Sequence, residues 1–289
     1  MKVISVLKSI TSHPLNKGHK LKAILRFVRW QINTKLNPYP VIYPFTEKTK
    51  LIVQKGMTGA TGNLYCGLHE YYDMSFLLHF LRREDTFADV GANIGSYTIL
   101  AAGHVGAKTF SFEPVPSTFD HLMDNIMINR LENRVSAFNI AVGSQKGTVG
   151  FTKSLDTTNH VACENDTDTI HVPVDTLDNI LGSHEHIPAL MKIDVEGFET
   201  EVIAGGKNVL TDRRLKAIII ELNGLGKQYG YDEQNIHTML LDWGFKPCEY
   251  NPEKRSLASV DTYGTHNTLY IRDEDFVKNR LTSNLVNLK

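Results

Sequence analysis

Short apolar runs alternate with amphipathic stretches along most of this chain of 289 residues. Apolar runs bounded by turns predict strands, and apolar residues spaced three to four apart predict helices. Strands are expected at Phe87–Asp89, Thr109–Phe112, Val135–Ile140, Ala189–Ile193, Lys216–Glu221, Phe245–Glu249 and Thr268–Arg272, and helices at Ser117–Asn129, Leu177–Leu181 and Asn235–Trp243. This alternation predicts an α/β fold with a mostly parallel seven-stranded sheet. The last two strands, joined by a long loop at Tyr250–His266, predict a terminal antiparallel hairpin.

Residues 144–174 interrupt the alternation and are interpreted as a β insertion. Two short strands are expected in it, Thr148–Thr152 and Thr169–Val174, joined by a polar stretch. That stretch contains Asp166-Thr167-Asp168, which matches the Asp-x-Asp pattern of metal-dependent glycosyltransferases, although three-residue patterns recur by chance. Upstream, Gly56–Gly62 is interpreted as a loop because it holds three glycines.

The N-terminal segment differs from the rest in charge. Residues 1–46 hold eight Lys or Arg and no acid, whereas the remainder holds 23 basic and 32 acidic residues. A helix is expected here, because apolar residues recur at helical spacing at Leu21, Ile24, Leu25, Val28 and Ile32. Either this helix docks on an acidic polymer, a membrane surface or a partner, or it packs on its own acidic domain. We expect a basic extension over residues 1–50 and a main domain over residues 51–289.

Composition favours a cytoplasmic protein. Hydrophobic residues make up 42% and charged residues 22% of the chain, which is ordinary for a globular protein. Cys66, Cys163 and Cys248 are widely spaced, which favours reduced thiols. No run approaches the ~18 apolar residues of a membrane span, so no transmembrane segment is expected.

The candidate chemistry begins at the stretch that opens at Phe87. An apolar run ends on Asp89 and passes through Gly91 and Gly95 into a helix. The glycines let a ligand approach the main chain, and the first helical N–H groups point at it. Glu113 ends the next strand, 24 residues after Asp89. An acid about 20 residues beyond such a turn commonly accepts ribose hydroxyls, so the pattern predicts an adenosine-bearing cofactor.

The glycine spacing narrows the cofactor. A dinucleotide site needs Gly-x-Gly-x-x-Gly, but Asn93 and Ser96 stand at the second and third glycine positions. The Asp-x-Gly-x-x-x-Gly spacing instead resembles the first motif of class I S-adenosylmethionine-dependent methyltransferases. The alternative is a strand-to-helix turn that binds no ligand.

Five stretches resemble, in order and spacing, the FkbM family of methyltransferases. They are Asp89–Gly95, Phe112-Glu113-Pro114, Asn139–Gly143, Thr176-Leu177-Asp178 and Lys192–Glu199. The resemblance covers roughly residues 60–275 and implies a class I methyltransferase (Rossmann-like) sheet with helices on both faces. It implies S-adenosyl-L-methionine as donor and O-methylation of a carbohydrate acceptor, usually a sugar hydroxyl of a glycan, polysaccharide or glycosylated natural product. N-methylation of bases or amides is disfavoured, because the Asn/Asp-Pro-Pro-aromatic motif of such enzymes is absent at Asp194–Gly197. No nucleic-acid partner is expected.

The expected cofactor residues lie at the strand ends and in the segment before the first motif. The segment at His69 and Glu70 commonly covers the methionine end of the cofactor in such enzymes, although it also fits a helix start. The full expected set is Glu70, Asp89, Gly91, Ala92, Asn93, Gly95, Ser96, Tyr97, Glu113, Pro114, Asn139 and Ala141.

A sugar hydroxyl is a weak nucleophile and needs a positioned base. Asp194, at the end of the strand Ala189–Ile193, is the first candidate, Glu196 the second and His160 the third. The alternatives are a helix cap for Asp194, a first-turn acid for Glu196 and a surface-loop histidine for His160. A divalent cation on Asp194, Glu196 and Glu221 would have suitable oxygen ligands, but no compact ligand spacing argues for it, and no metal is expected.

Three classes of function remain. The first is an S-adenosylmethionine-dependent O-methyltransferase that acts on a sugar. The second is a nicotinamide-dependent dehydrogenase, which Asn93 and Ser96 disfavour. The third is a non-catalytic methyltransferase-like module that binds a partner through the basic N-terminus. We expect the first.

Overall fold

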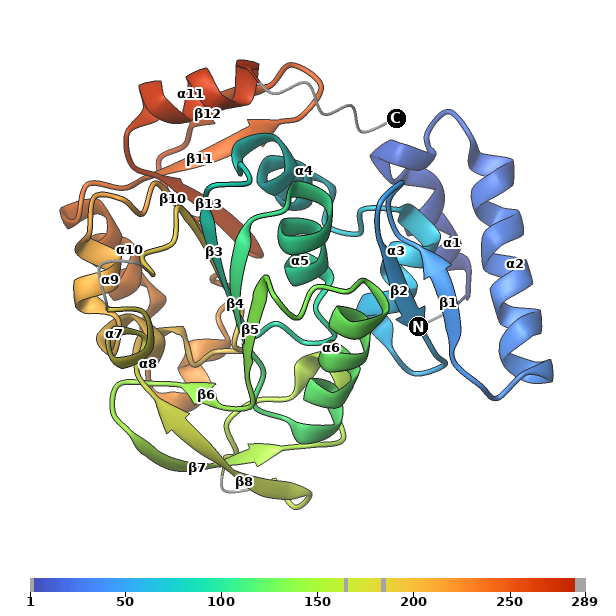
Figure 1. Cartoon of the computed structure of the whole chain (residues 1–289), viewed down its shortest axis with the longest axis horizontal. Helices are drawn as coiled ribbons and strands as arrows, with labels where there is room; N and C mark the ends of the chain where they lie inside the picture. The colour runs from blue at the N-terminus through green and yellow to red at the C-terminus, as the bar shows by residue number, and fades with distance from the viewer. Residues whose placement is uncertain (1–2, 164–165, 183–185, 284–289) are drawn as a thin grey trace.

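The computed structural model describes residues 3–163, 166–182 and 186–283 and is built on one eight-stranded sheet (Figure 1). Its strands run in the order β12-β11-β13-β10-β9-β3-β4-β5. Their bounds are β3 Thr86–Val90, β4 Lys108–Phe112, β5 Val135–Phe138, β9 Leu190–Ile193, β10 Ala217–Glu221, β11 Lys246–Asn251, β12 Ser256–Ser259 and β13 Asn267–Ile271. From β5 to β10 all neighbours are parallel, whereas β13, β11 and β12 pair antiparallel. The predicted α/β class and terminal hairpin are confirmed.

The predicted count of seven strands is wrong by one. The extra strand, β12, lies inside the stretch Tyr250–His266 that was expected to be a loop. Only Leu257 of this strand packs against the core, so the segment lacks the apolar alternation that marks a half-buried strand. Its pairing with β11 along an edge of the sheet defines it instead.

Helices cover both faces of the sheet, as Figure 1 shows. One face carries α4 Tyr71–Phe80, α5 Ser96–Ile99 with the π-helical turn Leu100–Val105, and α6 Pro116–Ile128; the other carries α7 Leu177–Leu181, α8 Glu199–Ala204, α9 Lys207–Thr211 and α10 Glu233–Asp242. Strand alternation divides the core between the faces. In β10, Ile219 joins the cluster under α4 to α6, whereas Ile218 and Ile220 join the cluster under α7 to α10.

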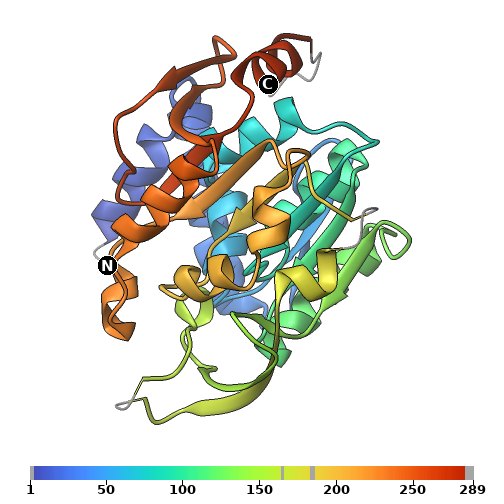
Figure 2. The same cartoon turned by 90° about the vertical axis from the view of Figure 1, so that its left-hand side faces the viewer.

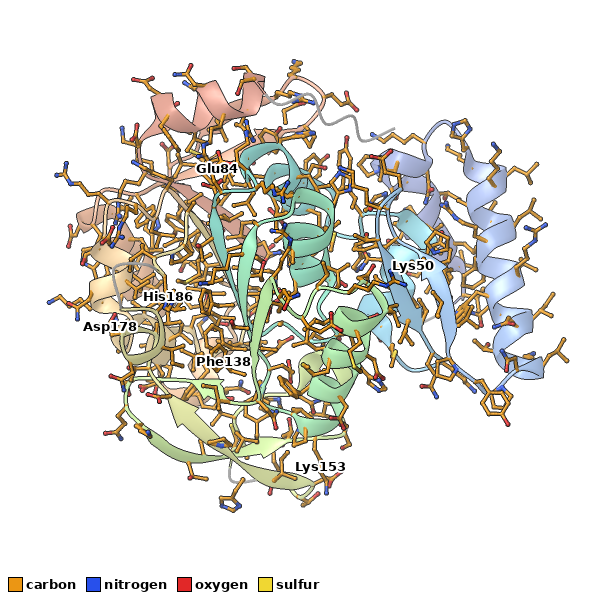
Figure 3. All side chains as sticks on the ribbon, viewed as in Figure 1. Lys50, Glu84, Phe138, Lys153, Asp178 and His186 are labelled. Atoms are coloured by element: carbon orange, nitrogen blue, oxygen red, sulfur yellow. The ribbon has the colours of Figure 1, made fainter. Side chains whose placement is uncertain are left out.

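Opposite ends of the sheet carry smaller elements in both views (Figures 1 and 2). The helix α11 Glu274–Ser283 packs against α4 at one end. At the other end, β6 Ala141–Val142, β7 Gly147–Thr152 and β8 Thr169–Asp175 form a separate three-stranded sheet. The two strands predicted in the insertion are therefore present as β7 and β8. Lys153, which directly follows β7, lies at this end, far from Glu84 beside the central sheet (Figure 3).

The N-terminal elements lie beyond the face covered by α4 to α6 (Figure 1). They are α1 Val3–Ser12, α2 Lys20–Leu36, the hairpin β1 Val41–Pro44 with β2 Lys50–Val53, and α3 Thr58–Cys66. The short helical turns along the chain are Pro14–Asn16, Asp156–Thr158 and Leu225–Tyr229. No helix among the described residues is long and apolar enough to cross a membrane.

The helix α2 packs on the main domain. The face that it buries is not the face on which its larger aliphatic residues recur. Ala23, Phe27 and Trp30 are buried, and Trp30 joins the core under α4 to α6. Arg26 Nη2 donates to the Tyr65 carbonyl at the end of α3 at 2.7 Å. Of the five apolar residues that predicted the helix, four are exposed; Leu21 is 71% exposed. The proposed boundary near residue 50 remains a prediction.

Candidate active site

A cavity of about 250 Å³ lies at the carboxyl ends of the parallel strands. Val90 of β3, Phe112 of β4, Lys192 of β9 and Glu221 of β10 all line it. Ligands of open α/β sheets bind at this edge because the strand-to-helix turns gather there. The cavity therefore lies where the sequence predicted the cofactor.

The turn after β3 needs glycine at two positions. Gly91 has a φ of +82°, and a Cβ there would lie 1.8 Å from the Asp194 carbonyl oxygen. Gly95 has a φ of +89°, and a Cβ there would lie 2.5 Å from the side chain of Leu122. Both positive φ and close approach exclude a side chain. The first glycine thus brings the turn against Asp194, while the second seats the following helix.

Glu113 organises the rim beside this turn. One carboxylate oxygen accepts from the Asn93 N–H at 3.0 Å, and the other accepts from the Val115 N–H at 2.9 Å. Burial raises the pKa of Glu113 to about 7. Each carboxylate oxygen can accept a further hydrogen bond, so both backbone bonds leave room for ribose hydroxyls. Asn139 holds this loop from behind, because its Nδ2 donates to the carbonyls of Glu113 and Pro114.

An apolar wall borders the rim. Its side chains come from the ends of β4 and of the three-stranded sheet, and they are Phe112, Pro114, Ile140, Ala141, Val142 and Phe151. An apolar surface next to a carboxylate that has room for hydroxyl donors suits a purine ring, which buries its faces and needs few hydrogen bonds.

An acidic side chain lines the cavity next to α4, and an amide and a second acid lie behind it. Glu70, which precedes α4, lines the cavity, and Asn267 of β13 donates to Glu70 Oε1 at 2.7 Å and to Asp73 Oδ2 at 3.2 Å. Burial and the nearby Glu70 raise the pKa of Asp73 to about 7. Negative groups at this end suit the ammonium of an amino acid.

Three carboxylates meet where β9 and β10 end. Oxygen atoms of Asp194, Glu196 and Glu221 lie within 4.8 Å of one another. Lys192 Nζ lies 2.6 Å from Asp194 Oδ2 and 4.9 Å from the centroid of the Tyr97 ring. The three oxygens are close enough to share one divalent cation, but Lys192 already supplies a positive charge to Asp194. We refer to Asp194, Glu196 and Glu221 as the carboxylate cluster.

Crowding sets the protonation of the cluster. Burial and the neighbouring Asp194 raise the pKa of Glu196 to about 7. Burial and the carboxylates of Asp194 and Glu196 raise the pKa of Glu221 to about 8. Burial alone would lower the pKa of Lys192, but Asp194, Glu70 and Asp89 raise it above its ordinary value. Glu196 and Glu221 thus exchange protons near neutral pH, the range in which general acids and bases work best.

The loop that carries Glu196 is fixed by several contacts. Glu196 has a φ of 55°, which is uncommon for a residue with a side chain, and Gln228 donates to its carbonyl at 3.1 Å. Buried Glu199 accepts from the N–H groups of Val195 and Gly197. The alternative role of Asp194 as a helix cap is wrong, because Phe198 is the N-cap residue of α8.

Most of the predicted site residues meet in this cavity. The residues that line it are Glu70, Asp89, Gly91, Ala92, Asn93, Ser96, Tyr97, Glu113, Pro114, Ala141, Asp194 and Glu196. Gly95, Asn139 and His160 are not among the lining residues. The first two support the loops described above. His160 Nε2 lies 3.3 Å from Asp166 Oδ2, and the ring is close enough to Glu196 to act on its charge.

The Asp-x-Asp pattern does not form a joint site. Asp166 pairs with His160, whereas Asp168 pairs with Lys153 on the exposed strand end. Two carboxylates that bind different partners on different sides do not make a metal-binding pair.

Several lining residues were not predicted from the sequence. Thr58, Gly59 and Asn63 come from α3, whose first five residues lie in the stretch Gly56–Gly62 that was expected to be a loop. A Cβ at Gly62 would lie 2.6 Å from the His69 ring, so at least this glycine serves close packing rather than a turn. Lys192 also lines the cavity, and its signal was visible: a lone charge in the apolar strand Ala189–Ile193. Thr157 and Asn159 of the insertion complete the wall.

Known proteins resemble this chain in sequence and in fold. The family model described as "Methyltransferase FkbM domain" matches residues 89–247. Hexuronic acid methyltransferase AglP of Haloferax volcanii is 28% identical over 205 residues, which cover 71% of this chain and 74% of that protein. The crystal structure of methyltransferase FkbM from Methylobacillus flagellatus KT aligns with a TM-score of 0.46 and 17% identity. That alignment covers 74% of this chain and 55% of the other, so the chain spans about half the length of that relative.

Proposed function

Because the chain belongs to the FkbM family of S-adenosylmethionine-dependent methyltransferases, we propose that it methylates a sugar hydroxyl of a glycan, polysaccharide or glycosylated natural product. The observation that carries this proposal is one cavity that joins a ribose acceptor, Glu113, to a carboxylate cluster at the strand ends. The named substrate class of the Haloferax volcanii relative, a hexuronic acid, supports a sugar acceptor. Membership of this family argues against the two alternatives, a nicotinamide-dependent dehydrogenase and a non-catalytic methyltransferase-like binding module.

The residues present fit S-adenosylmethionine along the whole cavity. Glu113 would accept the ribose hydroxyls, and the apolar wall at Phe112 and Ile140 would contact the adenine. The backbone of Gly91 and Ala92 lines the cavity between these two ends, where the rest of the cofactor would lie. At the other end, Glu70 would bind the ammonium group, with Asn267 holding its carboxylate in place.

The cofactor supplies an electrophilic methyl group on sulfur, so this chain has to orient the acceptor and take its proton. The hydroxyl oxygen must lie about 3 Å from the methyl carbon and in line with the departing sulfur. Asp194 accepts the hydroxyl proton, because it directly follows β9, lines the cavity and holds its carboxylate close to those of Glu196 and Glu221. Lys192 binds one oxygen of Asp194 and thereby fixes the direction of the other.

A hydroxyl fits the carboxylate cluster better than a carboxylate acceptor does. Hydroxyl groups donate hydrogen bonds to Asp194, Glu196 and Glu221, whereas an anionic group would meet like charges. We therefore expect methyl ethers of sugar hydroxyls rather than methyl esters as products.

Turnover should rise with pH through about 7 to 8, the range in which Glu196 and Glu221 lose their protons. Asp194 can pass the hydroxyl proton on to Glu196 or Glu221 only while these are ionised, so the limb ascends towards alkaline pH. Glu196→Gln removes a like charge beside Glu221, lowers the pKa of Glu221 and moves the limb to lower pH by about one unit. Rates of methyl transfer at saturating donor, measured from about pH 5.5 to about pH 9, would show the shift, because this range brackets the ordinary and the raised carboxyl pKa values.

Glu249→Gln, an exposed change on β11, is the matched control and should leave the limb in place. A rate that does not vary with pH, or a limb unmoved by Glu196→Gln, would show that the cluster does not govern proton transfer.

Donor binding is tested separately by calorimetric titration. The protein should bind S-adenosylmethionine and S-adenosylhomocysteine and should give no heat with NAD, because Asn93 and Ser96 replace the glycines of a pyrophosphate site. Binding of NAD alone would overturn the assignment of the cavity.

A further inference from the structure

Helix α2 has two apolar faces that point in opposite directions. Its inner face packs on the domain through buried Ala23, Phe27 and Trp30. Its outer face carries large apolar side chains that are between 43% and 80% exposed: Leu21, Leu25, Val28, Ile32 and Leu36. We call these five residues the outer stripe.

The outer stripe is continuous along the helix. Its members are spaced by four, three, four and four residues, so they share one side of α2 over its whole length. In Figure 3, side chains on the far side of α2 point away from the rest of the molecule. Among the described residues, nine of the fourteen exposed large hydrophobic residues lie between Val3 and Ile42. Such concentration marks an interaction surface, because exposed apolar residues are otherwise scattered.

Basic side chains border the outer stripe. Lys22, Arg29 and Lys35 are exposed on the same helix, and none of them forms an ion pair within the part of the chain that the structure describes. Arg29 lies four residues after Leu25 and three before Ile32, which places it beside the stripe. Residues 1–46 contain no acid. The surface that receives this face must therefore be apolar along a line and negatively charged on its flanks.

We propose that the outer stripe of α2 docks on an anionic lipid bilayer. A helix that lies in the bilayer interface buries its apolar side among the acyl chains while Lys and Arg reach the headgroups. Each basic residue near an anionic surface adds to the attraction. The outer stripe lies on the convex surface of one helix rather than in a groove. Such a surface suits a deformable partner that extends laterally, as a bilayer does.

A second copy of the chain fits this face less well. A two-fold interface would set Lys22, Arg29 and Lys35 of one copy against the same residues of the other. With no acid in residues 1–46 to neutralise them, the like charges would repel. The same absence of acids is an advantage on an anionic bilayer.

Docking through α2 would hold the cavity near the bilayer. The inner face of α2 contacts α3, where the Phe27 and Tyr65 rings lie 5.4 Å apart. The helix α3 in turn contributes Thr58, Gly59 and Asn63 to the cavity wall. The two helices α2 and α3 thus lie between the outer stripe and the cavity, whichever acceptor the enzyme uses.

Vesicle flotation with the full chain tests the proposal. The protein should float with vesicles of mixed phosphatidylcholine and phosphatidylglycerol, bind phosphatidylcholine vesicles weakly, and be released in part by high salt. Leu25→Gln with Ile32→Gln should weaken binding by at least about tenfold, because two apolar side chains lose their burial. The matched control, Met127→Gln with Leu241→Gln, changes two similarly exposed apolar residues on α6 and α10 and should bind normally.

A second set of variants measures the electrostatic contribution to vesicle binding. Replacing Lys22, Arg29 and Lys35 by Gln should weaken binding to the anionic vesicles by about 100-fold. Replacing exposed Lys207, Lys246 and Lys254 by Gln is the matched control and should have little effect. Thermal unfolding of each variant would establish that it is folded.

Two outcomes would overturn the proposal. One is a parent protein that stays with the unbound fraction in the presence of anionic vesicles. The other is a dimer in analytical ultracentrifugation that Leu25→Gln with Ile32→Gln dissociates, which would assign the outer stripe to a second copy. Neither result would bear on methyl transfer, because the variants lie outside the cavity.

Discussion

Asp194→Asn should lower turnover by about two to four orders of magnitude while leaving donor affinity nearly unchanged. Asp194 lines the cavity and its carboxylate belongs to the carboxylate cluster, where the acceptor hydroxyl must meet it. Asn keeps the shape of the side chain and can still accept from Lys192, but it no longer takes up a proton. Initial rates with methyl-labelled donor, together with titration of S-adenosylhomocysteine, would measure the two effects separately.

Asp120→Asn provides the matched control for that variant, because Asp120 is exposed on α6 and should change neither quantity. Retained turnover in Asp194→Asn would move the base to Glu196 or His160. Lost donor binding with a lowered melting temperature would instead identify Asp194 as a structural residue.

Glu113→Ala should weaken donor binding by about 1.5–3 kcal/mol, the range for hydrogen bonds to a charged group. This corresponds to an affinity loss of roughly 10- to 150-fold. The carboxylate also accepts from the N–H groups of Asn93 and Val115, so part of the loss comes from a loosened rim. Calorimetric titration of S-adenosylhomocysteine would measure the affinity.

The pH dependence of donor binding tests whether the Glu113 carboxylate itself binds the donor. Because burial raises the pKa of Glu113 to about 7, protonation below that pH removes an acceptor and should weaken binding. Glu113→Ala should lose this dependence, whereas the exposed control Glu132→Ala should keep both affinity and dependence. Equal affinity of Glu113→Ala and the parent would contradict the assignment to the ribose.

Local patterns predicted the strand–turn–helix unit and its acid. The positive φ at Gly91 and Gly95 is a property of the turn itself, and β4, the strand directly before Glu113, lies next to β3 in the sheet. Alternating apolar runs likewise predicted the parallel core, because each buried strand carries its own signal.

Features that depend on distant partners were not predictable from local pattern. Asn267 orients Glu70 across 197 residues, and β12 forms a strand because β11 pairs with it. In α2 the spacing of the larger aliphatic residues indicated that their face would be buried. The opposite face is buried instead, because Phe27 and Trp30 pack against the main domain. The glycines of α3 suggested a loop. Gly62 is instead part of the helix, where the His69 ring packs too closely for a side chain. Tertiary contacts overrode local preference in each case.

Transfer of labelled methyl groups tests the central claim most directly. The protein would be incubated with methyl-labelled S-adenosylmethionine and a set of neutral glycans and hexuronic-acid glycans, followed by alkaline treatment and sugar analysis. Methyl ethers on sugar hydroxyls, stable to alkali and reduced at least about a hundredfold by Asp194→Asn, are the predicted result. A protein that binds S-adenosylhomocysteine but labels no sugar, or that gives only alkali-labile methyl esters, would contradict it.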